Sequence, residues 1–513
     1  MLDPADAVRE LRLPPSLDNL FERTGRLTIA ARVAAQGLLT PDAPAVIEID
    51  SSGQIAKSLS WSALNAAVTR VACGYRAMGV GLHSRVAIAL ATGIEHVVAT
   101  HAAWRVGAIP APLDDQLPPA VSEAQLQLIN PHLTIAADPA VGFDLPTVAS
   151  AAATYDPIEW TLPSTWSILP TGGSTGVPKL AAQRGAIWGR LDRATSAQHR
   201  DYGLAVNQRQ LVVLPMFHGF GFGYAHAFGV ALGHCLVLLT KPTAELLLAC
   251  VERHAIEFLA LVPTQMGRVT RQSDFGVRDL SSIQAVVHGG EPCPALVKRA
   301  WMAKLGPTRV YEAYGAADVS LSCTVRGDQW LLRPGTVGRP SGTEVRILDD
   351  HGAELPAGSV GRIHCQPATI GASHPQYIGD RNPSRGFRPT GDRGWVDEEG
   401  FLYVAGRADN ALTMGGVTTA PEPIEETVRL CPAVLEVIVV GLPDADLGER
   451  IHAVVHARPG TDPEVVLQWC RDRLPMEKCP RSISLVHELP SSPAGKLDRH
   501  RAMQLALLEP PDS

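Results

Sequence analysis

Strand-like apolar runs alternate with helical segments through the first part of this chain. In the segment 61–78, apolar residues recur every three or four positions, which predicts an amphipathic helix. The stretch 93–106 predicts a second helix, and the runs that begin at Arg85 and Thr134 have the composition of buried strands. Such alternation builds βαβ units, in which helices cover both faces of a parallel sheet. The sequence therefore predicts an α/β fold.

The same alternation resumes from about residue 210 and then gives way to two other patterns. Further strands are expected at 210–214, 235–239, 257–262 and 283–287, and helices at 220–232 and 244–254. From about 335 to 405, short alternating runs are separated by turn signals, which favours a small β-subdomain. The last hundred residues or so predict a separate small α+β unit. The chain of 513 residues is long enough for about three units of roughly 150 residues each.

The composition argues against several classes of protein. Apolar residues make up 45% and charged residues 19% of the chain, which is ordinary for a soluble globular protein. The net charge of −7 offers no basic face, so we expect no nucleic-acid partner. Nine cysteines occur singly, which argues against a disulfide framework and fits a reducing compartment. The acidic N-terminus shows no secretory signal, so we expect a cytoplasmic location.

One uncharged stretch is compatible with either a membrane span or a buried core. Residues 211–240 contain no Asp, Glu, Lys or Arg, and their number is sufficient to cross a bilayer. They also contain Pro215, five glycines and three histidines. A strand–turn–helix–strand passage through a protein core has the same composition. This second interpretation is favoured, and we expect no membrane span.

The segment from Thr171 to Lys179 has the chemistry of a polyphosphate-binding loop. Its glycines allow backbone N–H groups to approach a ligand closely, and successive N–H groups form a nest for anionic oxygens. The residues that would contact phosphate oxygens are Thr171, Gly172, Gly173, Ser174, Thr175, Gly176 and Lys179. The pattern is not a Walker A loop, because two residues separate the last glycine from the lysine. An ordinary flexible surface loop remains the alternative.

Six segments, in this order, resemble the motifs of the adenylate-forming superfamily, which includes acyl-CoA synthetases, luciferases and peptide-synthetase adenylation domains. They are T-G-G-S-T-G-V-P-K (171–179), L-P-M-F-H-G-F-G (214–221), V-H-G-G-E-P (287–292), Y-E-A-Y-G-A-A-D (311–318), R-P-T-G-D-R-G (388–394), and G-R-A-D (406–409) with L-P-S-S-P-A-G-K-L-D-R (489–499). The resemblance covers about residues 45–500. Each segment alone is a weak signal, whereas their order and spacing together make coincidence implausible.

The resemblance implies a fold and a domain organisation. A large N-terminal domain, residues 1–408, would consist of layered α/β subdomains plus the β-subdomain at about 335–405, and would bind ATP and the acyl group. A small mobile α+β domain, residues 409–513, would carry the catalytic lysine. Asp409 matches the hinge about which the small domain swings. Without the resemblance, Asp409 would be an ordinary loop acid.

The resemblance also implies a reaction, in which a carboxylic acid and ATP form an acyl adenylate and the acyl group then passes to a thiol. ATP, Mg²⁺ and CoA would take part. Lys496 would be catalytic, reaching between the carboxylate and the α-phosphate. Asp392 would accept the ribose hydroxyls, Arg407 would lie near ribose and phosphate, and Tyr314 would stack on adenine. Loss of a preorganised electrostatic donor such as Lys496 usually costs about 10²–10³ in rate.

Further roles follow from the same motifs. Gly290 and Glu291 would border the adenine, with Gly315 beside Tyr314 in the nucleotide site. Asp318 would help to hold Mg²⁺, a hard cation that prefers carboxylate oxygens. His218 would orient the acyl carboxylate or gate its tunnel, although a histidine beside glycines is often structural. Gly415 and Gly416 would let the pantetheine arm of CoA pass close to the backbone, or they simply form a turn.

Four positions depart from the family pattern. Ala317 replaces a threonine, Asp318 replaces a glutamate, Thr413 stands where many members carry lysine, and Pro423 replaces an acid. These departures leave open a catalytically weak homologue that binds nucleotide or acyl ligand without turnover.

The uncharged stretch 211–240 also constrains which carboxylic acid the protein could activate. It lacks the acid that would pair with the ammonium group of an amino acid, so an α-amino acid is not expected. Gly219, Gly221 and Gly223 would leave room beside His218 for a fatty or aryl acid, and the fatty alternative implies fatty acid metabolism. The leading hypothesis is an AMP-forming acyl-CoA ligase. The alternative is a fatty acyl-AMP ligase that loads an acyl carrier protein, but the chain shows no obvious insertion of the kind such relatives often carry.

Overall fold

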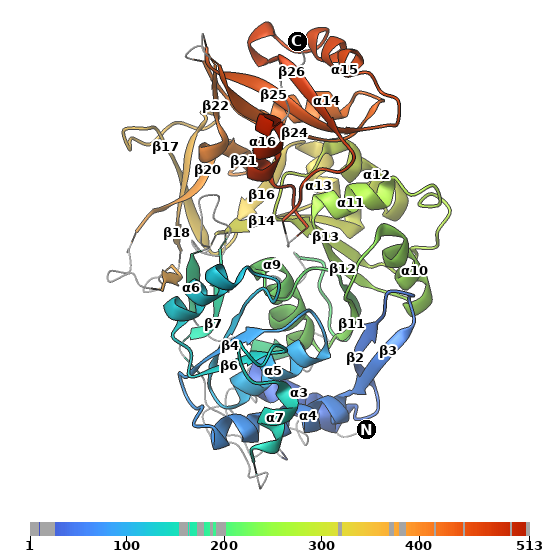
Figure 1. The fold of residues 1–513 in the computed structure, drawn as a ribbon, viewed down its shortest axis with the longest axis vertical. Helices are drawn as coiled ribbons and strands as arrows, with labels where there is room; N and C mark the ends of the chain where they lie inside the picture. The colour runs from blue at the N-terminus through green and yellow to red at the C-terminus, as the bar shows by residue number, and fades with distance from the viewer. Residues whose placement is uncertain are drawn as a thin grey trace.

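The computed structural model of this protein describes most of the chain. The described residues are 10, 26–152, 163, 165–171, 179–184, 188–190, 202–316, 321–368, 374–378, 386–414, 417–444, 447–492 and 495–508. The fold is mixed α/β, with a large N-terminal part and a small C-terminal part at one end of the long axis (Figure 1). The predicted fold class is confirmed.

One long sheet runs through the large part. Its strands lie in the order β17-β18-β20-β21-β16-β15-β14-β13-β12-β10-β11-β2-β3. The strands of its parallel section are β2 (Pro44–Ile49), β11 (Cys235–Leu239), β10 (Arg209–Val212), β12 (Phe258–Leu261), β13 (Ala285–Gly289) and β14 (Val310–Ala316). All of β11, β12 and β13 is buried, as expected for parallel strands covered on both faces. Helices α10 (Ala244–His254), α11 (Pro263–Thr270) and α12 (Ala295–Leu305) form the connections.

The strands at both edges of this sheet pair antiparallel. β3 (Ile55–Ser60) closes one edge. At the other edge lie β15 (Leu321–Arg326), β16 (Thr336–Pro340), β17 (Thr343–Leu348), β18 (Gly361–Pro367), β20 (Arg388–Val396) and β21 (Leu402–Arg407), with α13 (Gly327–Leu332) between β15 and β16. The strands expected between 335 and 405 therefore continue the long sheet rather than forming an isolated one. This continuity brings β20 and β21 to the same side of the molecule as β14.

The N-terminal segments build a second, smaller sheet. Parallel strands β4 (Arg85–Ala89), β5 (Ile109–Pro112) and β6 (Leu133–Ala136) form it in the order β5-β4-β6. The helices of this region are α3 (Ile29–Leu39), α4 (Trp61–Ala77), α5 (Ile94–Arg105), α6 (Pro119–Ile129) and α7 (Leu145–Ser150). The helix predicted at 61–78 begins at a Ser60 cap, whose side chain accepts from the backbone of Ala63, and it buries Trp61 and Tyr75.

The uncharged stretch 211–240 passes through the protein core. After β10 it forms α9 (Gly219–Phe222), a π-helix (Gly223–Gly229), a 3₁₀ turn (Val230–Leu232) and β11. Leu211, Phe222 and Leu236 are fully buried against neighbouring elements. No helix in the described part of the chain has the length and apolar character needed to cross a bilayer.

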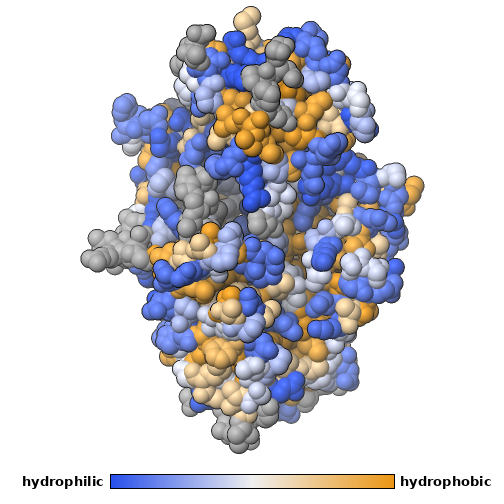
Figure 2. Space-filling model, viewed as in Figure 1, coloured by the Kyte–Doolittle hydropathy of each residue, from blue (hydrophilic) through white to orange (hydrophobic). Residues whose placement is uncertain are grey.

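The C-terminal part has a hydrophobic core of its own. Its elements are β22 (Leu412–Met414), β23 (Val417–Thr419), α14 (Pro421–Arg429), β24 (Val434–Asp444), β25 (Gly448–Ala457), α15 (Pro463–Arg471), β26 (Ser482–Val486) and α16 (Arg499–Leu508). Val437 and Val439 on β24 pack with Val455 on β25 and with Ile424 on α14. Figure 2 shows apolar side chains gathered on this part and hydrophilic ones over much of the belt below it.

Three buried histidines form an unusual cluster in the large part. His96 and His101 on α5 contact His226 on the π-helix, and all three are at most 1% exposed. The Nδ1 of His226 lies 3.3 Å from the Nε2 of His101. Burial lowers the pKa of His96 and His101 to about 3, so both are neutral at neutral pH. On unfolding, each returns to its ordinary pKa near 6.5.

We therefore predict an acid-sensitive stability. Between pH 6.5 and 3 the unfolded chain binds protons that the folded chain does not, so each such histidine lowers the free energy of unfolding by about 1.4 kcal/mol per pH unit as the pH falls. The melting temperature should fall between pH 7 and pH 5, and His101→Gln should weaken this dependence. The exposed His351→Gln is the control. An unchanged pH dependence in His101→Gln would contradict the assignment.

Candidate active site

A cleft of about 2140 Å³ opens where the parallel strands of the long sheet end. After β10 the chain crosses to β11 on one side and later returns to β12 on the other, so the strand order reverses at β10. Ligands of open α/β sheets bind at such a switch point, outside the carboxyl ends of the strands. His218 follows β10, Gly290 and Glu291 follow β13, and Tyr314 and Gly315 lie near the end of β14. All five line the cleft.

Lys496 enters this cleft from the C-terminal part. It follows a tight turn, in which Gly495 N donates to Ser492 O at 2.8 Å and Ser492 N donates to Lys496 O at 2.7 Å. Gly495 has φ +77°, a conformation that favours glycine. The lysine lies against Gly290, where an added Cβ would be 3.0 Å from Cε and 3.1 Å from Nζ of Lys496. Gly290 itself has φ +87°, so a side chain there would be strained and would crowd the lysine.

The surroundings of Lys496 leave its charge available for a ligand. Burial lowers the pKa of Lys496, and the nearby charge of Glu291 opposes this shift. Within the described residues, no carboxylate lies within 4.0 Å of its ammonium group. Burial likewise raises the pKa of Glu291, whose Oε1 accepts from the backbone N of Thr264 at 2.6 Å. Burial and the charge of Lys496 lower the pKa of His218 to about 3, so its imidazole is neutral.

A cluster of polar side chains lies at the β20–β21 edge of the cleft. The hydroxyl of Tyr314 donates to Oδ2 of Asp392 at 2.6 Å, and Nη1 of Arg407 lies 3.7 Å from Oδ1 of the same carboxylate. Asp392 and Arg407 are paired across the two strands, which fixes their separation. Nη2 of Arg407 also donates to Asp409 at 3.1 Å. Gly391 has φ +84°, and a Cβ there would lie 2.9 Å from the guanidinium.

The two ends of the glycine-rich loop also line the cleft. Thr171 N donates to Lys179 O at 2.8 Å, where β7 (Thr165–Pro170) and β8 (Leu180–Arg184) form a hairpin. Nζ of Lys179 lies 5.1 Å from the ring centroid of Tyr377. The predicted site residues that fall outside the described residues are Gly172, Gly173, Ser174, Thr175, Gly176, Asp318, Gly415 and Gly416.

The three glycines predicted for the acyl pocket do not share one role. Gly219 and Gly223 line the cleft, and a Cβ on Gly223 would meet open space. Gly221 is not among the lining residues. It is buried, and a Cβ there would lie 2.2 Å from the carbonyl oxygen of Pro215. The expectation that Gly221 opens space is therefore wrong, because its missing side chain permits close backbone packing instead.

Several acids that line the cleft were not predicted as site residues: Glu312, Glu422, Glu425, Glu426 and Glu436. Glu422, which precedes Pro423, lies at the cleft with its Oε2 against Gly406, where a Cβ would be 2.4 Å away. Burial raises the pKa of Glu422 to about 7. Within the described residues, its Oε2 has no hydrogen-bond partner. No sequence signal distinguishes this glutamate from its neighbours Glu425 and Glu426.

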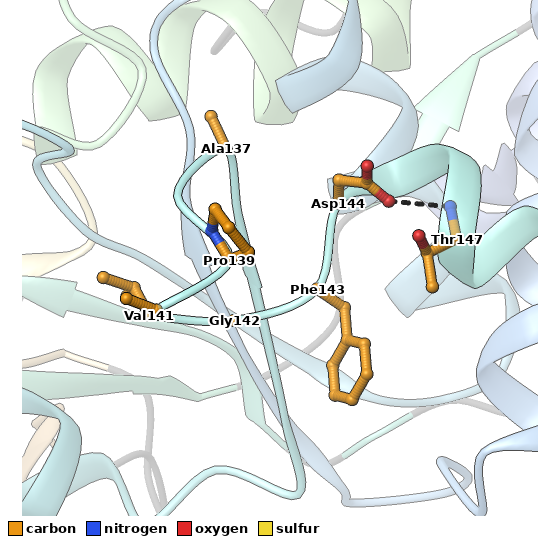
Figure 3. Close-up of a pocket in the computed structure, with 8 residues that line it drawn as sticks. Ala137, Pro139, Val141, Gly142, Phe143, Asp144 and Thr147 are labelled. Carbon is orange, nitrogen blue, oxygen red and sulfur yellow. Dashed lines mark hydrogen bonds between the residues drawn. The ribbon is translucent and has the colours of Figure 1, made fainter.

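A smaller pocket of about 420 Å³ lies in the loop between β6 and α7 (Figure 3). None of the predicted site residues lines it. Its one carboxylate, Asp144, caps α7 by accepting from Thr147 N at 2.8 Å. Phe143 and Val141 beside it are 46% and 38% exposed. The one carboxylate of this pocket therefore serves to cap a helix.

Ion pairs join the C-terminal part to the C-terminal end of α11, where Arg271 is the cap residue. Nη2 of Arg271 lies 2.6 Å from Oε1 of Glu436, and Nε of Arg268 lies 3.8 Å from the same oxygen. Nη2 of Arg268 also lies 3.5 Å from Glu488. The side chain of Glu436 is only 9% exposed. These contacts lie between the C-terminal part, which carries Lys496, and the large part.

Comparison with known proteins assigns this architecture to a family. The model of the AMP-binding enzyme family matches residues 33–370. The chain belongs to the AMP-binding enzyme family. The model of the AMP-binding enzyme C-terminal domain matches residues 423–496, which end at Lys496. The recognition of an adenylate-forming enzyme from the sequence motifs is thus confirmed.

Several curated relatives of this AMP-binding enzyme are named as CoA ligases. A sulfoacetate–CoA ligase of Cupriavidus necator is 28% identical, with 93% of this chain and 98% of the relative aligned. A 2-succinylbenzoate–CoA ligase of Bacillus cereus is 27% identical, with 92% and 97% aligned. Among solved structures, o-succinylbenzoate CoA synthetase from Bacillus subtilis with its acyl-adenylate intermediate has a TM-score of 0.79 at 23% identity, covering 95% of this chain and 100% of that one. The same synthetase with ATP and a magnesium ion has a TM-score of 0.77 at 24% identity, covering 93% and 99%.

We predict that Glu436→Gln loosens the docking of the C-terminal part. The substitution removes the charge shared by Arg271 and Arg268, and a loss of one or two kcal/mol would change the docked-to-undocked ratio about 5- to 30-fold. Limited proteolysis of the connecting segment 408–411 should accelerate accordingly. The matched control is Glu464→Gln, whose ion pair with Arg471 lies within α15. Equal cleavage rates for the two variants would show that the α11 ion pairs do not hold the interface.

Proposed function

We propose that this AMP-binding enzyme activates an aryl carboxylic acid as its acyl adenylate and transfers the acyl group to CoA. The observation that carries the proposal is the convergence in one cleft of Lys496, neutral His218 and the Asp392–Tyr314–Arg407 group. A cationic group thus shares one cleft with the Asp392–Tyr314–Arg407 cluster and with an aromatic wall. Adenylation needs this arrangement, because two anions must be brought together.

In the first half-reaction, a carboxylate oxygen of the acid attacks the α-phosphorus of ATP. The bond from that phosphorus to the bridging oxygen breaks, and pyrophosphate leaves with the electron pair. Lys496 would neutralise the approaching carboxylate and the α-phosphate oxygens, where charge passes during transfer. Asp392 would accept the ribose hydroxyls, and Arg407 would contact the ribose and phosphate. Lys179 and the loop between Thr171 and Lys179 would hold the departing pyrophosphate.

In the second half-reaction, the thiol sulfur of CoA attacks the acyl carbonyl carbon. The thiol proton passes to water, and AMP leaves as the carbonyl is re-formed. The names of the curated relatives support CoA as the acceptor and give no support to an acyl carrier protein. Gly415 and Gly416 are proposed to let the pantetheine arm pass, and Asp409 is proposed as the hinge between the two half-reactions.

Mg²⁺ would enter with the phosphates of ATP and neutralise part of their charge. Within the described residues, no group of three or more His, Cys, Asp or Glu side chains could hold a metal ion. This fits a cation whose ligands are mainly phosphate oxygens and water, with one or two carboxylates. Asp318 is proposed as the protein carboxylate.

The acyl side of the cleft favours an aromatic acid. Its lining includes Trp166, Phe220, Tyr224 and Phe228, and Phe220 and Tyr224 make an edge-to-face contact at 4.9 Å. Among the described lining residues from 166 to 228 there is no carboxylate, so an ammonium group would find no partner. Aromatic walls stabilise an aryl ring by stacking and edge contacts. The curated relatives lend fatty acid metabolism no support.

Lys496→Ala is predicted to separate the two half-reactions. Removal of its charge should lower adenylation, measured as ATP–pyrophosphate exchange, by about 10²–10³. Thiolysis of a supplied acyl adenylate by CoA should stay close to the wild-type rate. Lys57→Ala, which changes an exposed lysine on β3, is the control for both assays. Equal loss of both half-reactions in Lys496→Ala would contradict the assigned role.

Pyrophosphate exchange with a panel of aryl and fatty acids tests the proposed function itself. We expect exchange with aryl acids and acyl-CoA as the product. Exchange confined to fatty acids would overturn the aryl assignment. ATP binding without exchange for any acid would instead support the catalytically weak homologue, which the departures at Ala317 and Pro423 leave open.

A further inference from the structure

Two hydroxyl groups meet at one point of the cleft wall. The hydroxyl of Tyr202, which precedes β10, hydrogen-bonds with Oγ of Ser322 on β15. Both residues line the cleft, and Tyr202 is 7% exposed. Ser322 is paired in register with Gly315, which lies beside Tyr314. The pair therefore lies where the nucleotide side of the cleft meets its acyl side.

The rest of this wall is aromatic. The ring of Phe228 stacks on that of Tyr202, with centroids 6.2 Å apart. Tyr224 packs on Phe228 at 5.2 Å, and Phe220 packs on Tyr224 at 4.9 Å. Tyr202 and Ser322 thus place a pair of hydrogen-bonding hydroxyls beside the aromatic rings of this wall.

The hydroxyl pair keeps unused hydrogen-bonding capacity. Each hydroxyl can donate once and accept twice, and the bond between them uses one donor. Within the described residues, neither side chain makes a second hydrogen bond. A desolvated hydroxyl without a partner costs free energy, so the pair favours a ligand that supplies one.

We infer that Tyr202 and Ser322 recognise a hydrogen-bonding substituent on the acyl group, which makes the substrate a hydroxy- or amino-substituted aryl acid. The inference rests on the proposed function and adds a determinant of its specificity. A site built to hydrogen-bond a substituent rejects the analogue that lacks it, because the protein group is then left unpaired when the ring excludes water. At about 1–3 kcal/mol for one unpaired group, the discrimination should be about 5- to 150-fold.

The test compares kcat/KM for pyrophosphate exchange across benzoate and its 2-, 3- and 4-hydroxy and amino derivatives. We expect one substituted acid to exceed benzoate by about 5- to 150-fold in the wild type. Tyr202→Phe and Ser322→Ala should each lower kcat/KM for the favoured substituted acid more than kcat/KM for benzoate, so that the preference shrinks. Tyr403→Phe, which removes a tyrosine hydroxyl that bonds Asp397, is the matched control.

The outcomes separate this inference from the proposed function. Exchange with benzoate and its derivatives at similar rates would overturn the inference and leave the aryl-CoA ligase standing. A substituent preference that survives in both Tyr202→Phe and Ser322→Ala would likewise assign recognition to other residues. Exchange with no acid of the panel, despite ATP binding, would overturn the proposed function and the inference together.

Discussion

The close approach of Lys496 to Gly290 joins two distant parts of the chain into one site. The ammonium group lies against backbone at the end of β13, which is possible because Gly290 has no side chain and adopts a positive φ. A charge carried into a partly buried cleft loses solvation, which lowers the pKa of Lys496. The same charge helps to keep His218 neutral. The electrostatics of the cleft therefore depend on whether the C-terminal part is docked.

The docking interface and the interior of the C-terminal part are held by different forces. Its interior is a separate apolar core around Val437 and Val455. Its contact with α11 is polar, through Glu436 and two arginines. Polar interfaces between parts of a chain resemble transient ones and permit relative motion. Such an interface is compatible with the hinge proposed at Asp409.

The sequence predicted more of the fold than of the cleft wall. The helices at 61–78 and 244–254 and the strands near 210 and 235 follow from periodicity alone, because burial on one face leaves a direct trace in sequence. Motif residues such as Asp392 and Lys496, which a distinctive chemistry in a recognisable pattern singles out, also line the cleft. Glu422 was missed and Gly221 was misinterpreted, because neither backbone contact nor burial of one acid among several is visible locally.

What the sequence by itself determined is the family, the alternation of strands and helices, and the candidate residues at the ends of the strands. Tertiary structure alone decided which of these residues meet. The hydrogen bonds from Tyr314 to Asp392 and between Tyr202 and Ser322 join residues 78 and 120 positions apart. The physical reason is that the reversal of strand order at β10 and the docking of a separate unit create the cleft. Neither is encoded in any local pattern.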